Sequence, residues 1–136
     1  RDPLVRVGAK GQSLKLWYDL DSPHPAYGGL ALHLRRGEAE SIDLTGYTRL
    51  VLFARGGKSR TAHTTRLKIE LLSKSQSAWV ELAGLTGEWR RFEIPLAEFK
   101  GITDWTRLTE LRLLLEQSHV DQREGILYFD EILFCK

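Results

Sequence analysis

The sequence predicts an all-β protein, a sandwich of two antiparallel β-sheets of the jelly-roll kind. Three observations support this. Roughly eight segments have strand-like hydrophobic patterns, turn residues separate most of them, and no segment keeps the 3.6-residue repeat of a long helix. Many short strands joined by polar turns are typical of antiparallel sandwiches and jelly rolls.

The first half of the chain holds four predicted strands, after an entry segment that could add a short strand at residues 4–7. Most of them alternate apolar and polar residues, as strands with one buried face do. Residues 49–55 are instead apolar at both parities, which suits a central strand covered on both sides. The four strands are 13–20, 28–34, 49–55 and 66–72, with a Pro-rich turn between the first two.

The second half adds strands at residues 78–82, 89–96, 110–116 and 125–134. Pro95 cannot donate to a sheet ladder, so its strand belongs at an edge or a crossing point of the sandwich. Residues 96–101 and 104–111 could each form a short helical turn after it, with Thr103 or Asp104 capping the second. Neither is long enough for a crossover helix. We expect the apolar side chains of this connection to cap the open end of the core: Phe99, Ile102 and Trp105.

Size and charge limit the function classes. A chain of 136 residues makes one domain, residues 1–136, and a net charge of +2 from scattered basic residues gives no general case for nucleic acid or an anionic membrane. No segment is apolar over the ~18 residues that a membrane span needs. The lone Cys135 forms no internal disulfide. Because the chain starts at Arg1 and holds no Met, we expect it to be part of a larger protein.

No catalytic motif is found. The four His residues are dispersed, without H-x-x-x-H or H-x-H spacing, and the sequence has no G-x-S-x-G, P-loop or G-x-G-x-x-G pattern. Residues 54–59 weakly resemble a phosphate loop but lack its first Gly at the proper distance, and no helix pattern follows them. We therefore predict that the chain is not an enzyme.

Three segments resemble one lineage of galactose-binding-like jelly rolls, the carbohydrate-binding modules of bacterial glycanases, which are related to the complex I intermediate-associated proteins. The segments are 43–56 (DLTGYTRLVLFARG), 87–116 and 125–134 (GILYFDEILF). They share a strand after DLxGY, a Trp-to-Pro strand, a connection ending in an aromatic residue, and a final strand carrying an Asp. The resemblance implies a two-sheet sandwich, a structural calcium ion, glycan binding on the concave sheet or at the loop end, and an extracellular or periplasmic bacterial protein.

Asp130 is the candidate metal ligand. It interrupts an apolar strand, so its carboxylate lies at an exposed bulge or beside a cation. Calcium takes six to eight oxygen ligands, and the resemblance implies that this Asp holds the ion together with groups near the N-terminal strand. Glu38, Glu40 and Asp43 are candidate partners, which the sequence does not rank. The alternative is an Asp that caps a turn or bulge, or pairs with an Arg.

The aromatic residues divide into two groups. Those in the shared frame are expected in the core or as end caps: Tyr47, Trp89, Phe92 and Trp105. Trp17 and Trp79 lie opposite the aliphatic residues of their own strands, so we expect exposed indoles. An exposed indole offers a flat apolar plate on which the C–H face of a sugar can stack.

Charged residues on neighbouring outward positions could hydrogen-bond the sugar hydroxyls. The predicted carbohydrate-binding residues are Lys15, Trp17, Asp19, Arg55, Lys68, Trp79, Arg112 and Glu116, and Arg66 and Glu70 share the pattern. The alternative is the solvated polar face of any exposed sheet. The first function hypothesis is therefore a non-catalytic carbohydrate-binding module, whose partners are a glycan and the neighbouring domains of its parent protein. The second is a protein-interaction or assembly domain on the same fold. Exposed indoles in a groove would favour the glycan, whereas a flat apolar patch around them would favour a protein partner.

Overall fold

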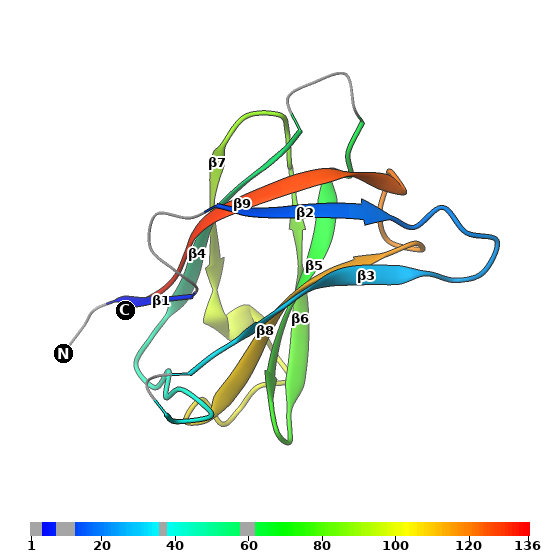
Figure 1. Cartoon of the computed structure of the whole chain (residues 1–136). Coiled ribbons are helices and arrows are strands. Elements are labelled where there is room, and N and C mark those ends of the chain that lie inside the picture. Colours follow the sequence, from blue (N-terminus) through cyan, green and yellow to red (C-terminus); the bar gives the residue numbers. More distant parts are fainter. Residues whose placement is uncertain (1–3, 8–12, 36–37, 58–61) are drawn as a thin grey trace.

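The described part of the chain, residues 4–7, 13–35, 38–57 and 62–136 of a computed structural model, forms nine strands in two antiparallel sheets (Figure 1). Sheet A contains β1 (Leu4–Arg6), β2 (Leu14–Asp19), β9 (Glu124–Cys135), β4 (Arg49–Gly56) and β7 (Arg90–Pro95). Sheet B has the order β3 (Tyr27–His33), β8 (Leu108–Glu116), β5 (Arg66–Ser73) and β6 (Ser77–Ala83). Every strand predicted from the sequence is present, and the all-β sandwich is confirmed.

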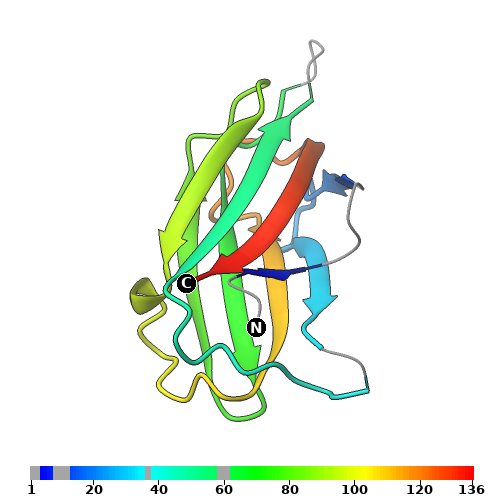
Figure 2. The ribbon, with the colours of Figure 1, turned by 90° about the vertical axis from the view of Figure 1, so that its left-hand side faces the viewer.

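The chain crosses repeatedly between the two layers, which is why consecutive strands often belong to different sheets. Figure 2 shows sheet A in front of sheet B, with the strands of each sheet side by side. Strand β7 forms an edge of sheet A, so Pro95 at its end needs no ladder partner on its outer side, as predicted. Strands β4 and β8 are central, which explains their nearly continuous apolar sequences.

Strand β9 organises sheet A. On one side it pairs with β2 through residues 124–129 and with β1 through residues 133–135, and on the other side it pairs with β4. The register with β4 shifts between Val51 and Phe53, which pair with Leu133 and Asp130. Two residues of β9, Glu131 and Ile132, thus lie opposite the single residue Leu52 of β4, so β9 has one extra residue and bulges.

The bulge returns the apolar side chains of β9 to the core. Phe129 and Ile132 are both buried although they are three positions apart, a spacing that would place them on opposite faces of a regular strand. Glu131 accommodates the extra length with φ of +50°, and its backbone N–H donates to Asp130 Oδ1 at 2.8 Å. Asp130 therefore caps a bulge, which is one of the alternatives that the sequence left open.

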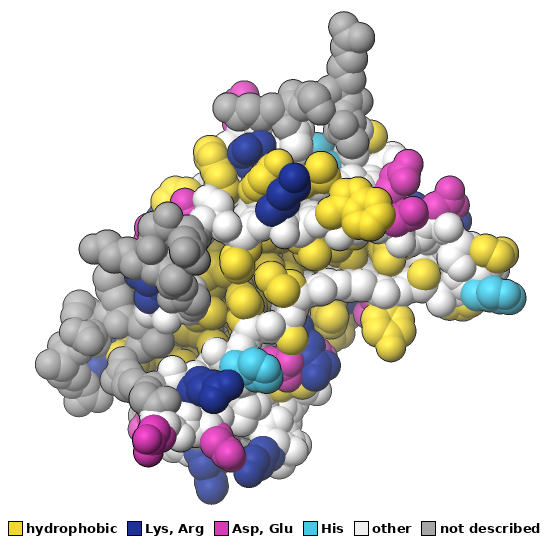
Figure 3. All heavy atoms as spheres, in the orientation of Figure 1, with side chains coloured by type: hydrophobic (Ala, Val, Ile, Leu, Met, Phe, Trp, Pro, Cys, Tyr) yellow, Lys and Arg dark blue, Asp and Glu magenta, His cyan; other side chains and the backbone are white. Residues whose placement is uncertain are grey.

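The core lies between the inner faces of the two sheets. Its fully buried side chains come from central strands of both: Leu52 on β4, Phe129 and Phe134 on β9, and Ile69 and Leu113 on β5 and β8. Between β2 and β3, at the side of the sandwich, hydrophobic side chains reach the surface (Figure 3). Four of these edge-strand residues are only partly buried against the core: Leu14, Leu16, Leu30 and Leu32.

The connection between β7 and β8 closes one end of the core. Phe99 and Ile102 are buried and Trp105 packs partly buried against the core, so the predicted end cap is confirmed. The first predicted helical turn is present as the 3-10 helix η1 (Leu96–Glu98). The second, at residues 104–111, is wrong: Asp104 Oδ1 accepts the backbone N–H of Thr106 in a tight polar turn, and strand β8 starts at Leu108. Among the described residues no helix has the length and apolar character to cross a membrane.

Candidate functional site

The predicted site residues lie on two opposite outer faces of the sandwich. Lys15, Trp17, Asp19 and Arg55 belong to β2 and β4 of sheet A, whereas Lys68, Trp79, Arg112 and Glu116 belong to β5, β6 and β8 of sheet B. Both indoles are exposed, Trp17 by 67% and Trp79 by 51%. The residues that the sequence grouped into one surface therefore form two separate surfaces.

We call the outer surface of sheet B the B face. It is formed by every second residue of its four strands, in rows that the register defines. One row contains Ala31, Arg112, Glu70 and Trp79, from β3 to β6. The row of His33 and Glu110 lies on one side of it and the row of Gly29 and Leu114 on the other, and Tyr27 and Glu116 lie one row further.

The charges of the B face are paired with one another. Arg112 Nη2 lies 3.1 Å from Glu110 Oε2, and its Nη1 lies 3.5 Å from Glu70 Oε1. The hydrogen bond to Glu110 raises the pKa of Arg112 above its ordinary value, against the opposing effect of burial. Lys68 Nζ lies 3.0 Å from Glu116 Oε2. This ladder fixes the orientation of long side chains that would otherwise move freely, so hydrogen-bonding groups are held in place across the sheet.

Trp79 stands at the edge of the B face with polar groups around its ring. Lys68 Nζ lies 4.2 Å from the ring centroid, close enough for a cation–π contact. The His119 ring meets the indole edge to face, with centroids 6.4 Å apart, and His119 Nε2 lies 2.8 Å from Glu81 Oε1. These contacts hold the indole while half of its surface stays exposed.

A shallow groove of about 330 Å³ runs along the other edge of the B face. Its floor is low because β3 presents Gly29 and Ala31 there, and Arg112 and Leu114 form one wall. Gly29 has φ of +152°, and a Cβ atom at this position would lie 2.0 Å from the Leu113 carbonyl oxygen, so a side chain cannot replace it without moving the strand. Tyr27, which is 81% exposed, stands at the end of this groove.

Sequence reasoning missed Tyr27 as a residue of the sheet face, although it could have been found. Leu30 and Leu32 point inward from β3, so strict alternation places residues 27, 29, 31 and 33 on the outer face. The Pro-rich turn before Tyr27 hid the start of the strand.

The segment between β8 and β9 is fixed next to the B face. Thr65 donates its backbone N–H to Asp121 Oδ1 at 2.8 Å and its hydroxyl to the other carboxylate oxygen. Burial raises the pKa of Asp121, but the hydrogen bonds from Thr65 and Thr64 together outweigh it and hold the pKa below its ordinary value. Arg66 Nε also donates to the His119 carbonyl oxygen. The segment is thereby held so that His119 reaches Trp79.

We call the outer surface of sheet A the A face. Across it, Lys15, Tyr128 and Arg55 lie in one row of paired residues, and Trp89, which directly precedes β7, continues that row. Trp17 lies opposite Ile126 in the next row. The expectation that Trp89 is a core or cap residue is wrong, since it is 41% exposed, whereas Phe92 is buried as expected. Alternation explains the difference, because Phe92 and Ile94 point inward and residue 89 has the opposite parity.

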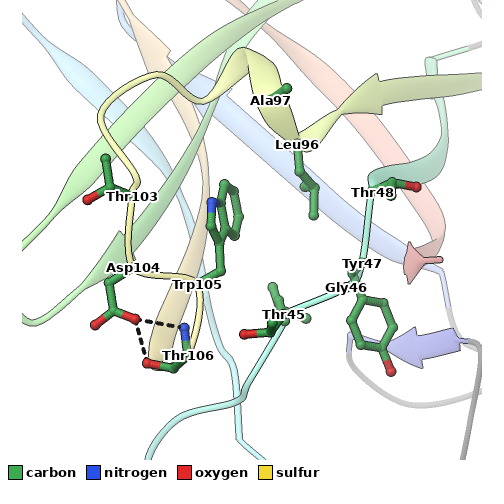
Figure 4. Close-up of a pocket in the computed structure, with 11 residues that line it drawn as sticks. Thr45, Gly46, Tyr47, Thr48, Leu96, Ala97, Thr103, Asp104, Trp105 and Thr106 are labelled. Carbon is green, nitrogen blue, oxygen red and sulfur yellow. Dashed lines mark hydrogen bonds between the residues drawn. The ribbon is translucent and has the colours of Figure 1, made fainter.

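A third candidate location is an open pocket of about 470 Å³ at the end of the sandwich (Figure 4). Trp105 and Leu96 line it from the connection before β8, and residues 44–48 line it from the connection before β4. Asp104 is tied to Thr106 and so does not reach freely into the space. The pocket could hold one ring or a chain end, but it offers no extended surface.

The acidic residues named as calcium ligands do not come together. Asp130 accepts the Glu131 N–H, Asp43 Oδ1 accepts the Thr45 N–H at 2.8 Å, and Glu40 lies 4.0 Å from Lys74 Nζ. No group of three or more His, Cys, Asp or Glu side chains placed to hold a metal ion occurs within the described ranges. This donor set does not fit a calcium site, and calcium binding at Asp130 stays a prediction.

The fold is similar to those of known carbohydrate-binding modules. The family 11 carbohydrate-binding module of the cellulosomal cellulase Lic26A-Cel5E of Clostridium thermocellum matches with a TM-score of 0.67 and 13% identity, over 97% of this chain and 79% of that one. The family 30 module of the cellulosomal cellulase Cel9D-Cel44B of Clostridium thermocellum matches with a TM-score of 0.64 and 15% identity, over 99% and 83%. No protein-family model and no curated protein matches the sequence. The jelly-roll expectation is thus confirmed at the level of the fold.

Proposed function

We propose that this chain is a non-catalytic carbohydrate-binding module that holds an extended oligosaccharide on the B face. The observation that carries the proposal is the arrangement of that face: an exposed indole at one edge, a groove with an exposed Tyr27 at the other, and fixed charged groups between them. Three strand spacings separate the two edges, roughly 14 Å at ~4.8 Å each. That length suits a chain of several sugars rather than a single one.

The chemistry of the B face suits a neutral polysaccharide. Trp79 and Tyr27 provide flat apolar surfaces, and the guanidinium and carboxylate groups of Arg112, Glu70 and Glu110 provide donors and acceptors for hydroxyl groups. Because the guanidinium is already paired with two carboxylates, this cluster has no free cation for an acidic ligand and favours hydroxyl groups. The similarity to modules that are named for carbohydrate binding supports the same function class.

The proposal also covers hydrolysis, the parent protein and its location. The chain binds its glycan without hydrolysing it, and hydrolysis belongs to a neighbouring domain of a larger bacterial protein. Such a protein acts outside the cytoplasm, in the periplasm or the extracellular space, where polysaccharides occur. An assembly domain on the same fold is the remaining alternative if no glycan binds.

Affinity gel electrophoresis tests the proposal. The chain is run through gels that contain mixed-linkage β-glucan, xylan or galactomannan, with a non-binding protein as the mobility reference. We expect one of these neutral polysaccharides to retard the chain, and we expect no reducing ends to be released from it. Retardation by none of them, together with no signal on a broader neutral glycan array, would remove the proposal.

A further inference from the structure

Arg55 on the A face is held between aromatic rings. Its Cζ lies 4.1 Å from the centroid of the Tyr128 ring and 5.1 Å from that of Trp89, so the guanidinium is placed by stacking. Nη1 donates to the Gly56 carbonyl oxygen at 2.9 Å, and the buried Nε has no hydrogen-bond partner among the described residues. One hydrogen bond is little for a group with five N–H donors.

Arg55 also lacks a carboxylate partner within the described part of the chain, and so does Lys15. This distinguishes them from two other cations of sheet A. Arg49 and Arg91, on the same sheet, both contact Glu93 at 2.8 and 3.3 Å. Lys15 and Arg55 flank Tyr128 on its two sides, since both pair with it in register. The Tyr128 ring thus lies between two cations, one on each side, that have no carboxylate partner among the described residues.

We propose that the A face carries a second binding site, for an acidic oligosaccharide such as one built of uronic acids. Its rings would stack on Trp17, Tyr128 and Trp89, and its carboxylates would pair with Lys15 and Arg55. A guanidinium presents parallel donors that match a carboxylate, and stacking has already fixed its plane. This row of two cations and two aromatic rings favours a ligand that has both sugar rings and carboxylates. A neutral sugar leaves the cations unpaired, and a small anion leaves the aromatic rings uncovered.

The direction of the ligand follows from the charges around it. Along β2, basic and hydrophobic side chains come first, and acidic side chains gather at the end of the strand (Figure 3). Asp19 and Glu124 form that acidic end, one row past Trp17 and Ile126. An acidic chain is therefore drawn to the Lys15–Arg55 row and runs across the strands, away from Asp19. This site is independent of the B face, which lies on the opposite sheet.

Calorimetric titration with a pentamer of galacturonic acid tests the site, and the fully methyl-esterified pentamer is the matched neutral ligand. We expect the acid to bind about tenfold more tightly than the ester, and we expect this preference to shrink when the ionic strength is raised. Lys15→Gln and Arg55→Gln should each reduce binding of the acid to about the level of the ester. Arg91→Gln on the same face and Arg112→Gln on the B face should leave it unchanged.

Melting curves accompany each variant. Arg55 is packed between rings and its replacement could disturb the fold, but Lys15 is exposed, so Lys15→Gln decides the question in a folded protein. Equal binding of acid and ester, no binding of the acid, or loss of binding in Arg112→Gln but not in Lys15→Gln would each overturn the proposal. Loss of neutral-glycan binding in B-face variants leaves it untouched.

Discussion

Trp17 and Trp79 lie on opposite outer faces of the sandwich, Trp17 on β2 of sheet A and Trp79 on β6 of sheet B. Both are more than half exposed. No single flat ligand can therefore stack on both rings of one molecule, so a substitution of either Trp tests binding at one face only.

Trp79→Ala should weaken binding of a neutral polysaccharide by about 1 to 3 kcal/mol, because it removes an aromatic anchor of the B face. Trp17→Ala is the matched control, since it removes an even more exposed indole from the other face and should leave this binding unchanged. Affinity electrophoresis measures both. If Trp17→Ala alone abolishes neutral-glycan binding, the site was placed on the wrong sheet.

Leu113→Ala and Leu114→Ala compare the two faces of one strand. Leu113 is completely buried between the sheets, so its truncation should cost about 2 to 5 kcal/mol in the free energy of unfolding through lost burial and a cavity. Leu114 is only partly buried, beside the groove of the B face, and should cost about 1 kcal/mol or less. Urea unfolding gives both values. Equal losses would mean that the register of β8 is shifted by one residue.

The pH dependence of stability should include a contribution from Asp121. Its pKa is lower in the folded chain than in the unfolded one, so its stabilising effect is complete above the unfolded pKa of about 3.9 and is lost as the pH falls through the folded value. Asp121→Asn should lower the melting temperature at neutral pH and approach the wild type as the pH falls below about 4.

Asp21→Asn is the control for this titration, because the Asp21 carboxylate accepts no hydrogen bond from the described residues. It should melt close to the wild type at neutral pH. If the melting-temperature difference between Asp121→Asn and the wild type persists unchanged in acid, Asp121 stabilises the fold through its packing and not through its charge.

Asp130→Ala should destabilise the chain by about 1 kcal/mol with or without calcium, because it removes the acceptor for the Glu131 N–H at the bulge. If calcium binds there as well, the ion adds about 2.7 kcal/mol to the wild type at a hundredfold excess over its Kd, and the variant loses that part. Melting curves in calcium and in chelator separate the two effects. Identical wild-type curves in both conditions would end the calcium hypothesis.

Glu131→Gly tests the backbone of the bulge. A residue with a Cβ atom at φ of +50° is strained by about 1 to 2 kcal/mol, which glycine relieves. The change also removes the exposed ion pair with Arg6, worth about 0 to 1 kcal/mol. Glu131→Ala removes the pair alone and keeps the strain, so Glu131→Gly should be the more stable variant in thermal unfolding. The opposite order would show that this residue does not need a left-handed conformation.

Alternation was enough to predict the strands and most of the buried positions, because burial between two sheets acts on every second residue. It correctly separated Leu67, Ile69 and Leu71 from Lys68 and Glu70 on β5. The same rule would have found Trp89 and Tyr27 as outward residues. Tyr27 was missed because its strand was expected to start one residue later, and Trp89 was assigned to the core because it belongs to the frame shared with the resembling modules.

The grouping of outward residues into faces could not be predicted in this way. Alternation tells which side of a strand is buried but not which sheet contains the strand. The outward residues of β2 and β5 are chemically alike, with a Lys on each, and only the pairing of β2 with β9 and of β5 with β8 assigns them to different faces. That pairing depends on contacts between residues that are far apart in the sequence, from Ser73–Leu108 on β5 and β8 to Leu14–Phe129 on β2 and β9.

The place of β9 at the centre of sheet A has a consequence for the order of folding. Among the described residues β2 has no other partner in its sheet, and β4 has only β7 besides β9. Sheet A therefore cannot close until residues 124–135 have left the ribosome. Sheets built from such distant pairings fold slowly and expose strand edges while they wait. A nascent chain stopped before β9 would expose the unpaired edges of β2 and β4, which could then pair with strands of other chains. Synthesis of β9 therefore protects the chain against aggregation.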